Sequence, residues 1–186
     1  DYLRMRTQQM SRKNMFKFTF LGVIGLSIVA CGEAEEEVLV YETVEACIEA
    51  GEQDAAVCKS EFAKAQKLHN EVAPSYHAAG DCYSDFGYNR CNQYRRSNGT
   101  SVWLPFMMGY MLAPRGGMSI ISSQPLYRTT SDPNRYHTAG TGRVGTVSGN
   151  GRSQVAKSQT RPTVRTRTVA RGGFGARARS GMGVGS

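Results

Sequence analysis

The stretch from Asp54 to Ala73, DAAVCKSEFAKAQKLHNEVA, decides the expected fold because its apolar side chains recur with the period of a helix. The apolar face comprises Val57, Cys58, Phe62, Ala65, Leu68 and Val72. Glu61 lies off this face and is expected to be solvated. Asp54 is a suitable N-cap, and Pro74 ends the pattern. The sequence therefore predicts an amphipathic helix that buries one face.

Two shorter helices are expected on either side of this one. Residues 44–50 follow Thr43, which can cap them, and residues 82–91 (CYSDFGYNRC) indicate about a turn and a half of helix that ends at Gly87. With residues 43–113 taken as the folded part, the sequence predicts a small, mainly α head.

Residues 1–30 have the features of a signal peptide. Basic residues precede an uncharged run, FTFLGVIGLSIVA (18–30), of thirteen residues, whereas a transmembrane helix needs about 20. The run ends in Ile28-Val29-Ala30-Cys31, a lipobox whose small residues admit a peptidase and whose thiol accepts lipid. We expect cleavage before Cys31, palmitate among the acyl chains on Cys31, and a tether over 31–42. An ordinary signal peptide or an uncleaved anchor is the alternative.

Gly32, and not Asp, follows the lipidated cysteine, which points to the outer membrane, facing the periplasm. An exported chain meets oxidising conditions, so the even number of remaining cysteines predicts two disulfides. These cysteines are Cys47, Cys58, Cys82 and Cys91. Three connectivities are possible, and we favour the local one, Cys47–Cys58 with Cys82–Cys91. Each bond would close a loop of about ten residues and stabilise the fold by roughly 2.5–3 kcal/mol.

A metal site that uses these cysteines with His69 or His77 is the alternative to disulfides. The cysteine spacings lack the tight C-x₂-C pairs of zinc sites, so no metal ligand is expected. No motif in the sequence implies a cofactor.

Residues 102–113 (VWLPFMMGYMLA) form the most apolar stretch after the signal and are expected to act as a hinge behind the head. Trp103, Phe106 and Tyr110 either pack onto the head or form a partner surface, since Met and aromatic residues suit both. The stretch is too short to span a membrane.

The net charge of +8 is unevenly distributed along the chain. Residues 31–113 carry six Lys/Arg against thirteen Asp/Glu, whereas residues 114–186 carry twelve Lys/Arg against Asp132 alone. Because Gly, Ser, Thr and Arg dominate residues 114–186, we expect a long disordered tail. Its arginines could bind anionic lipid, lipopolysaccharide or an acidic protein, could pair with the acidic head, or could remain solvated.

Arg171 and Phe174 lie in the sequence RGGF (171–174), which is similar to an RNA-binding RGG box. A single copy is weak support, and an exported chain rarely meets RNA, so nucleic acid is not the expected partner. Arg171 and Phe174 are therefore candidates for a protein or envelope surface.

Several sequence blocks occur in the order found in the YgiB/YjfM-type family of uncharacterised enterobacterial proteins, which this chain resembles. The blocks are Cys31, Cys47 with Cys58, CYSDFGYNRC (82–91), WLP (103–105), MGYM (108–111), QPLY (124–127) and RGGFG (171–175). The resemblance implies an envelope lipoprotein, and it supplies no activity and no catalytic residues.

Three function classes follow from these patterns. The favoured one is a non-enzymatic envelope lipoprotein that engages a partner or an anionic envelope surface. The others are a purely structural or protective surface lipoprotein and an envelope enzyme. No nucleophile elbow, metal helix or set of paired carboxylates supports an enzyme. The fragment GTGR (140–143) is similar to part of a phosphate loop but lacks the following Lys, and no strand is expected before it.

Overall fold

The structure is a computed structural model that describes residues 33–115, 119–163 and 173–174. The expected signal peptide over 1–30, the lipidation site Cys31 and Arg171 lie outside the described residues.

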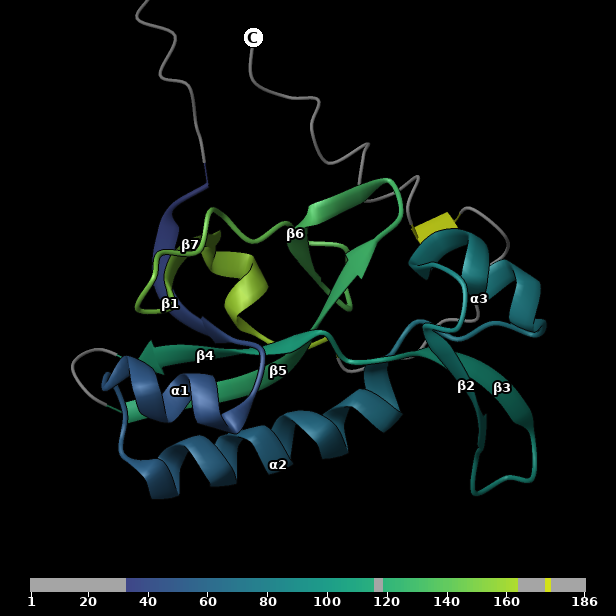
Figure 1. The fold of residues 1–186 in the computed structure, drawn as a ribbon, viewed down its shortest axis with the longest axis horizontal. Coiled ribbons are helices and arrows are strands. Elements are labelled where there is room, and N and C mark those ends of the chain that lie inside the picture. The colour runs from purple at the N-terminus through teal and green to yellow at the C-terminus, as the bar shows by residue number, and fades with distance from the viewer. Residues whose placement is uncertain (1–32, 116–118, 164–172, 175–186) are drawn as a thin grey trace, which may run out of the picture. The chain divides into compact units, whose positions relative to one another are not determined.

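The described residues form seven strands, three α-helices and one short 3₁₀ helix, joined by turns and loops. Figure 1 shows their arrangement. The helices are α1 (Val44–Ala50), α2 (Ala55–Val72), α3 (Ala79–Phe86) and η1 (Lys157–Thr160). The strands are β1 (Glu35–Tyr41), β2 (Cys91–Arg95), β3 (Ser101–Pro105), β4 (Gly109–Arg115), β5 (Ser119–Thr129), β6 (Asp132–Thr138) and β7 (Arg152–Ala156).

Five of the strands form one curled antiparallel sheet in the order β6-β5-β4-β1-β7, and β2 and β3 form a separate hairpin. The expected mainly α head with a disordered tail is therefore wrong, because the described fold is mainly β. The stretch 102–113, expected to be a hinge, supplies most of β3 and β4, and residues 119–160 of the expected tail supply β5, β6, β7 and η1.

The connection between β6 and β7 bonds to both edge strands of the curled sheet. Val144 N donates to Tyr136 O of β6 at 3.0 Å, and Gly145 N donates to Gln154 O of β7 at 2.8 Å. Further along, Ser148 N donates to Arg152 O at 2.9 Å. Edge strands otherwise present unpaired backbone groups. Here the connection supplies partners to both edges.

Alternation along the strands places different side chains on the two faces of the curled sheet. One face buries an apolar cluster that comprises Val38, Val40, Met111, Ala113, Leu126, Tyr136, Val144 and Val155. At one end of this cluster η1 bonds to the sheet, where Gln124 Nε2 donates to Gln159 O at 2.6 Å. The opposite face of β1 and β4 packs against α1 and α2 through Leu39, Tyr41, Tyr110, Leu112, Ala65 and the disulfide Cys47–Cys58.

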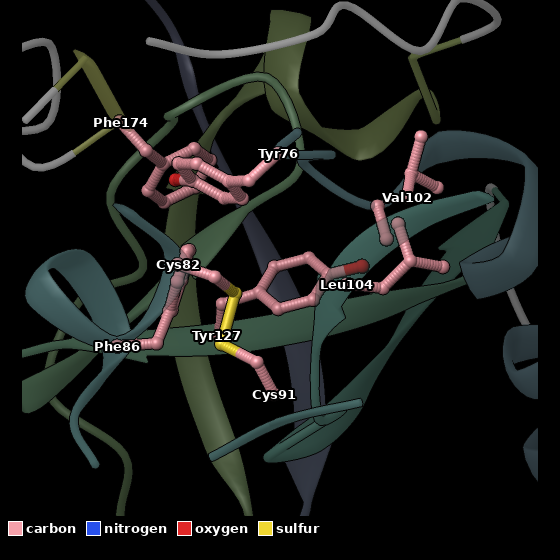
Figure 2. Packing of buried hydrophobic residues seen from close by; sticks show 9 residues of the cluster. Tyr76, Cys82, Phe86, Cys91, Val102, Leu104, Tyr127 and Phe174 are labelled. Atoms are coloured by element: carbon pink, nitrogen blue, oxygen red, sulfur yellow. A yellow bond between two sulfur atoms is a disulfide. The ribbon is translucent and has the colours of Figure 1, made fainter. Parts of the chain in front are cut away.

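A third cluster joins α3, the β2–β3 hairpin and β5 (Figure 2). The disulfide Cys82–Cys91 ties the start of β2 to α3. Phe174 lies in this cluster with 2% of its surface exposed, and its ring centroid is 5.2 Å from that of Phe86 and 6.2 Å from that of Tyr127. The Phe174 amide donates to Asp85 Oδ2 at 3.3 Å, and the Tyr76 hydroxyl donates to the same oxygen at 2.8 Å.

The predicted helices are present close to their expected bounds. Ala46 N donates to the Thr43 side chain at 3.1 Å, so Thr43 caps α1. Asp54 is the N-cap residue of α2 but makes no side-chain cap hydrogen bond. Glu61 is buried, contrary to expectation, and accepts a hydrogen bond from Lys64 Nζ at 2.6 Å. This bond compensates part of the cost of burying the carboxylate.

The prediction of disulfide bonds is confirmed, and the bonds join neighbours in sequence, Cys47 with Cys58 and Cys82 with Cys91. All four cysteines are therefore unavailable as metal ligands. Among the described helices, none combines the length and the apolar character needed to cross a membrane.

Candidate binding groove

An open groove of about 610 Å³ runs between α2 and the connection from β3 to β4. We call it the α2 groove. Its lining combines aromatic, amide and charged side chains, namely Glu42, Phe62, Ala63, Gln66, Lys67, His69, Asn70, Asn92, Phe106 and Met107. The volume lies within the range of roughly 300–1,000 Å³ that small-molecule sites occupy.

One side of α2 forms the first wall of the groove. Phe62, Gln66 and Asn70 follow each other at intervals of four residues, so they lie one above another on the helix. Phe62 also reaches inward, where its ring meets the buried Tyr110 ring edge-on with centroids 5.3 Å apart. The packing of Phe62 holds this side of α2 against the core, and the two exposed amides lie on the same side of the helix.

Phe106 stands on the opposite wall, with 45% of its surface exposed. Its amide donates to Arg90 O at 2.8 Å, and the Met108 amide donates to Leu126 O at 2.9 Å. The backbone is therefore held on both sides of the exposed ring. A large exposed aromatic side chain on a fixed backbone is a common feature of recognition surfaces, because little conformational entropy is lost on binding.

His69 lies deeper in the groove and contacts the core. Its Nδ1 is 2.9 Å from the hydroxyl of Tyr127, which is fully buried. Burial lowers the pKa of His69 to about 4 and raises the pKa of Tyr127 well above its ordinary value. The two groups therefore form a neutral pair at pH 7. When Tyr127 donates, Nε2 of His69 carries the ring proton and can donate to a ligand.

Glu42 lies at the end of the groove within a network of its own. Its Oε1 accepts from Arg128 at 2.9 Å and from the Tyr136 hydroxyl at 2.6 Å. The Arg128 guanidinium also lies 4.1 Å from the centroid of the Tyr136 ring. These contacts orient the Glu42 carboxylate and neutralise its charge.

The structure separates the residues named as possible members of a partner surface. Phe106 lines the groove, whereas Tyr110 and Phe174 are buried at 0% and 2% exposure and serve packing. Trp103 is half-buried on β3 and meets the Tyr83 ring at 6.0 Å. The sequence reasoning missed Gln66 and Asn70, although their spacing on a predicted helix was a usable signal, and it considered His69 only as a metal ligand.

A second cavity, of about 490 Å³, contains the fragment GTGR (140–143). Contrary to expectation, a strand, β6, does end just before it. Its amides are nevertheless used within the chain, since Thr141 N donates to Thr138 O at 2.9 Å and Gly142 N donates to Thr138 Oγ1 at 3.1 Å. The side chain of Gln159 packs against Gly142. A phosphate loop needs such amides directed at the ligand, so this arrangement does not resemble one.

Several basic residues of the expected tail bind acidic residues of the same chain. Arg152 bonds to Glu37 at 2.8 Å and to Glu52 at 2.7 Å, and Arg143 lies 3.4 Å from Asp132. Together with the Arg128–Glu42 pair, these contacts engage three arginines internally. Each such contact competes with binding of an external polyanion.

The described residues contain no group of three or more His, Cys, Asp or Glu side chains placed to hold a metal ion.

The family model "Protein of unknown function (DUF1190)" matches residues 35–185. A UPF0441 protein of Klebsiella pneumoniae is 29% identical over 165 residues, which cover 80% of this chain and 74% of that protein. A UPF0441 protein of Erwinia tasmaniensis is 31% identical over 165 residues with the same coverage. One from Photorhabdus laumondii is 30% identical over 173 residues, covering 78% of this chain and 74% of that protein. No solved structure matches this chain significantly.

Proposed function

Because the chain belongs to the DUF1190 family of proteins of unknown function, whose relatives occur in enterobacteria, we propose its role from its own sequence and structure. We propose a non-enzymatic envelope lipoprotein, held on the outer membrane by lipid on Cys31, that binds a partner in the α2 groove. The family assignment agrees with the resemblance seen in the sequence blocks, and it supplies no activity.

The observation that carries the proposal is the exposed Phe106 ring on a fixed backbone in the wall of the α2 groove. Among the described residues, the large apolar or aromatic side chains that are well exposed are Ile48, Tyr88 and Phe106. Of these, Phe106 lines the α2 groove, and Ile48 and Tyr88 do not. A clustered set of polar groups around a fixed aromatic ring favours recognition of a partner over a purely protective surface.

The titratable groups of the groove support a binding role over catalysis. His69 is held neutral by burial and bonded to Tyr127, and Glu42 is bonded to Arg128 and Tyr136. General acid–base catalysis works best with a pKa near the operating pH. The pKa of His69, at about 4, lies far below that range.

Binding to an anionic envelope surface is the second candidate. The basic composition of residues 114–186 favours it. The internal ion pairs of Arg128, Arg143 and Arg152 argue against it for the described residues. We therefore place the groove first.

Photocrosslinking in intact cells tests the groove. A photoreactive benzoylphenylalanine replaces Phe106 in one variant and Ile48 in a matched control, because Ile48 is 39% exposed and does not line the groove. We expect a covalent adduct of higher mass from position 106 and none, or a different one, from position 48. The absence of an adduct at 106, or the same adduct at both positions, would contradict partner binding in the groove.

Labelling cells with radioactive palmitate tests the anchor. We expect label on the wild-type protein and none on a Cys31→Ala variant, because the thiol is the acceptor of the lipid. Unlabelled wild-type protein, or label that persists in the variant, would refute lipidation at Cys31.

A further inference from the structure

We propose that the α2 groove binds a neutral glycan chain that carries N-acetyl groups. This inference rests on the proposed function, which places a partner in the groove, and adds the chemical class of that partner. The argument uses the aromatic ring, the amides, the apolar floor and the charge of the groove in turn.

The Phe106 ring offers a platform for a sugar ring. The faces of a pyranose carry C–H groups with a small positive charge, and these are attracted to the negative face of an aromatic ring. Because nearly half of the Phe106 surface is exposed, its ring has room for such a contact. The fixed backbone at Phe106 reduces the entropy lost when a sugar stacks on it.

Amide side chains are the main polar groups of the groove, contributed by Gln66, Asn70 and Asn92. A carboxamide both donates and accepts, as a sugar hydroxyl does, so one amide can bond to two neighbouring hydroxyls. All three residues are exposed. His69 adds a ring nitrogen beside them, since burial keeps its imidazole neutral.

An apolar strip lies among these amides and consists of Phe62, Ala63 and Met107. An N-acetyl group presents a methyl group beside a peptide-like amide. The strip can receive the methyl group of the ligand while a neighbouring carboxamide side chain of the protein bonds to the amide of the N-acetyl group. A glycan without N-acetyl groups would leave this strip exposed to water.

Few charged side chains line the groove, so most of its polar contacts come from uncharged groups. Glu42 is bonded to Arg128 and Tyr136, and Lys67 is the basic residue of the lining. The second cavity has two basic residues, Arg135 and Arg143, with Glu35 beside them and Arg143 paired to Asp132. A phosphate or an acidic glycan is held best by several cations, whereas Lys67 is the single Lys or Arg side chain in the lining of the α2 groove.

Saturation-transfer NMR on the full-length protein in detergent tests the proposal with three soluble probes. Chitotetraose, a neutral oligomer of N-acetylglucosamine, is the expected ligand at millimolar concentration. Maltotetraose has the same length without acetyl groups and is expected to bind more weakly. Tetraglycine represents a peptide and is expected not to bind. Binding of tetraglycine in preference to chitotetraose, or no binding of chitotetraose, overturns the glycan proposal.

Variants place the binding in the groove. Phe106→Ala and Asn70→Ala are each expected to weaken chitotetraose binding by about tenfold, which corresponds to about 1.4 kcal/mol. Ile48→Ala, outside the groove, is expected to leave chitotetraose binding unchanged. Both groove residues are exposed, so an unchanged circular dichroism spectrum and urea midpoint verify the fold. Chitotetraose binding that survives Phe106→Ala unchanged refutes the assignment.

The crosslinking experiment separates this proposal from the one on which it rests. An adduct at position 106 without chitotetraose binding means that the groove binds a partner of another class, and only the glycan proposal fails. The absence of both results means that both proposals fail.

Discussion

Replacing Phe174 by Ala tests whether the RGGF segment belongs to the core. The Phe174 ring is 2% exposed and packs against Phe86 and Tyr127. A buried aromatic side chain removes roughly 150–250 Å² from water, which at about 25 cal/mol per Å² gives an upper limit of about 4–6 kcal/mol. Measured Phe→Ala changes in cores amount to about 3–5 kcal/mol. We expect a loss in this range.

The matched control is the same substitution at Phe106, whose ring is 45% exposed. It leaves no closed cavity and is expected to lower the free energy of unfolding by about 1 kcal/mol or less. Phe174→Ala retains the backbone amide that donates to Asp85, so the comparison isolates the ring.

Urea unfolding followed by the fluorescence of Trp103 measures both variants. Trp103 is the single tryptophan and packs against the cluster that contains Phe174, so its emission reports on that cluster. A loss below about 1 kcal/mol for Phe174→Ala, or losses of equal size for the two variants, would refute the burial of Phe174.

Two further predictions concern stability. Replacing Cys47 and Cys58 together by Ala removes a bond that closes a loop of 11 residues. The free energy of unfolding, measured in urea, should fall by about 3 kcal/mol. An unchanged urea midpoint would contradict the presence of the bond. The pKa of His69 is lowered to about 4 in the folded protein, so the folded state binds fewer protons than the unfolded state below about pH 6.5. Stability that is present at pH 7 should therefore be lost as the pH falls from about 6.5 to 4, by up to about 3 kcal/mol. Urea titrations across this range should show a smaller loss for His69→Gln, and identical pH profiles would contradict the burial of His69.

The helices were predictable because their signals are local. Thr43 caps α1, Gly51 ends it with a φ of +69°, and α2 has a clear apolar period. These features depend on neighbours within a few residues of each other.

The strands beyond residue 118 were not predictable because polar side chains occupy buried positions. Gln124, Thr138 and Ser153 are all buried within the sheet. Gln124 is satisfied by the backbone of Gln159, and Thr138 by the side chain of the same residue. Such long-range hydrogen bonds cannot be inferred from the sequence. Without them, the composition of the segment is that of a disordered chain. Pro125, inside β5, further argued against a central strand.

The candidate groove was predictable only in part. Phe106 and Tyr110 were both given as residues of either the core or a partner surface, and the sequence did not separate the exposed Phe106 from the buried Tyr110. The difference arises because Phe106 lies in the connection between strands, whereas Tyr110 alternates toward α2. Strand bounds, which were unknown, decide this alternation.

The position of β1 has a consequence for the order of folding. β1 is the first described strand, and it lies between β4 and β7, the last one. Glu35 pairs with Ala156, so the sheet is incomplete until residue 156 has been synthesised. Contacts between residues so far apart form slowly. For a chain that is exported, as we propose, late completion of the sheet favours a polypeptide that is still unfolded when it crosses the membrane.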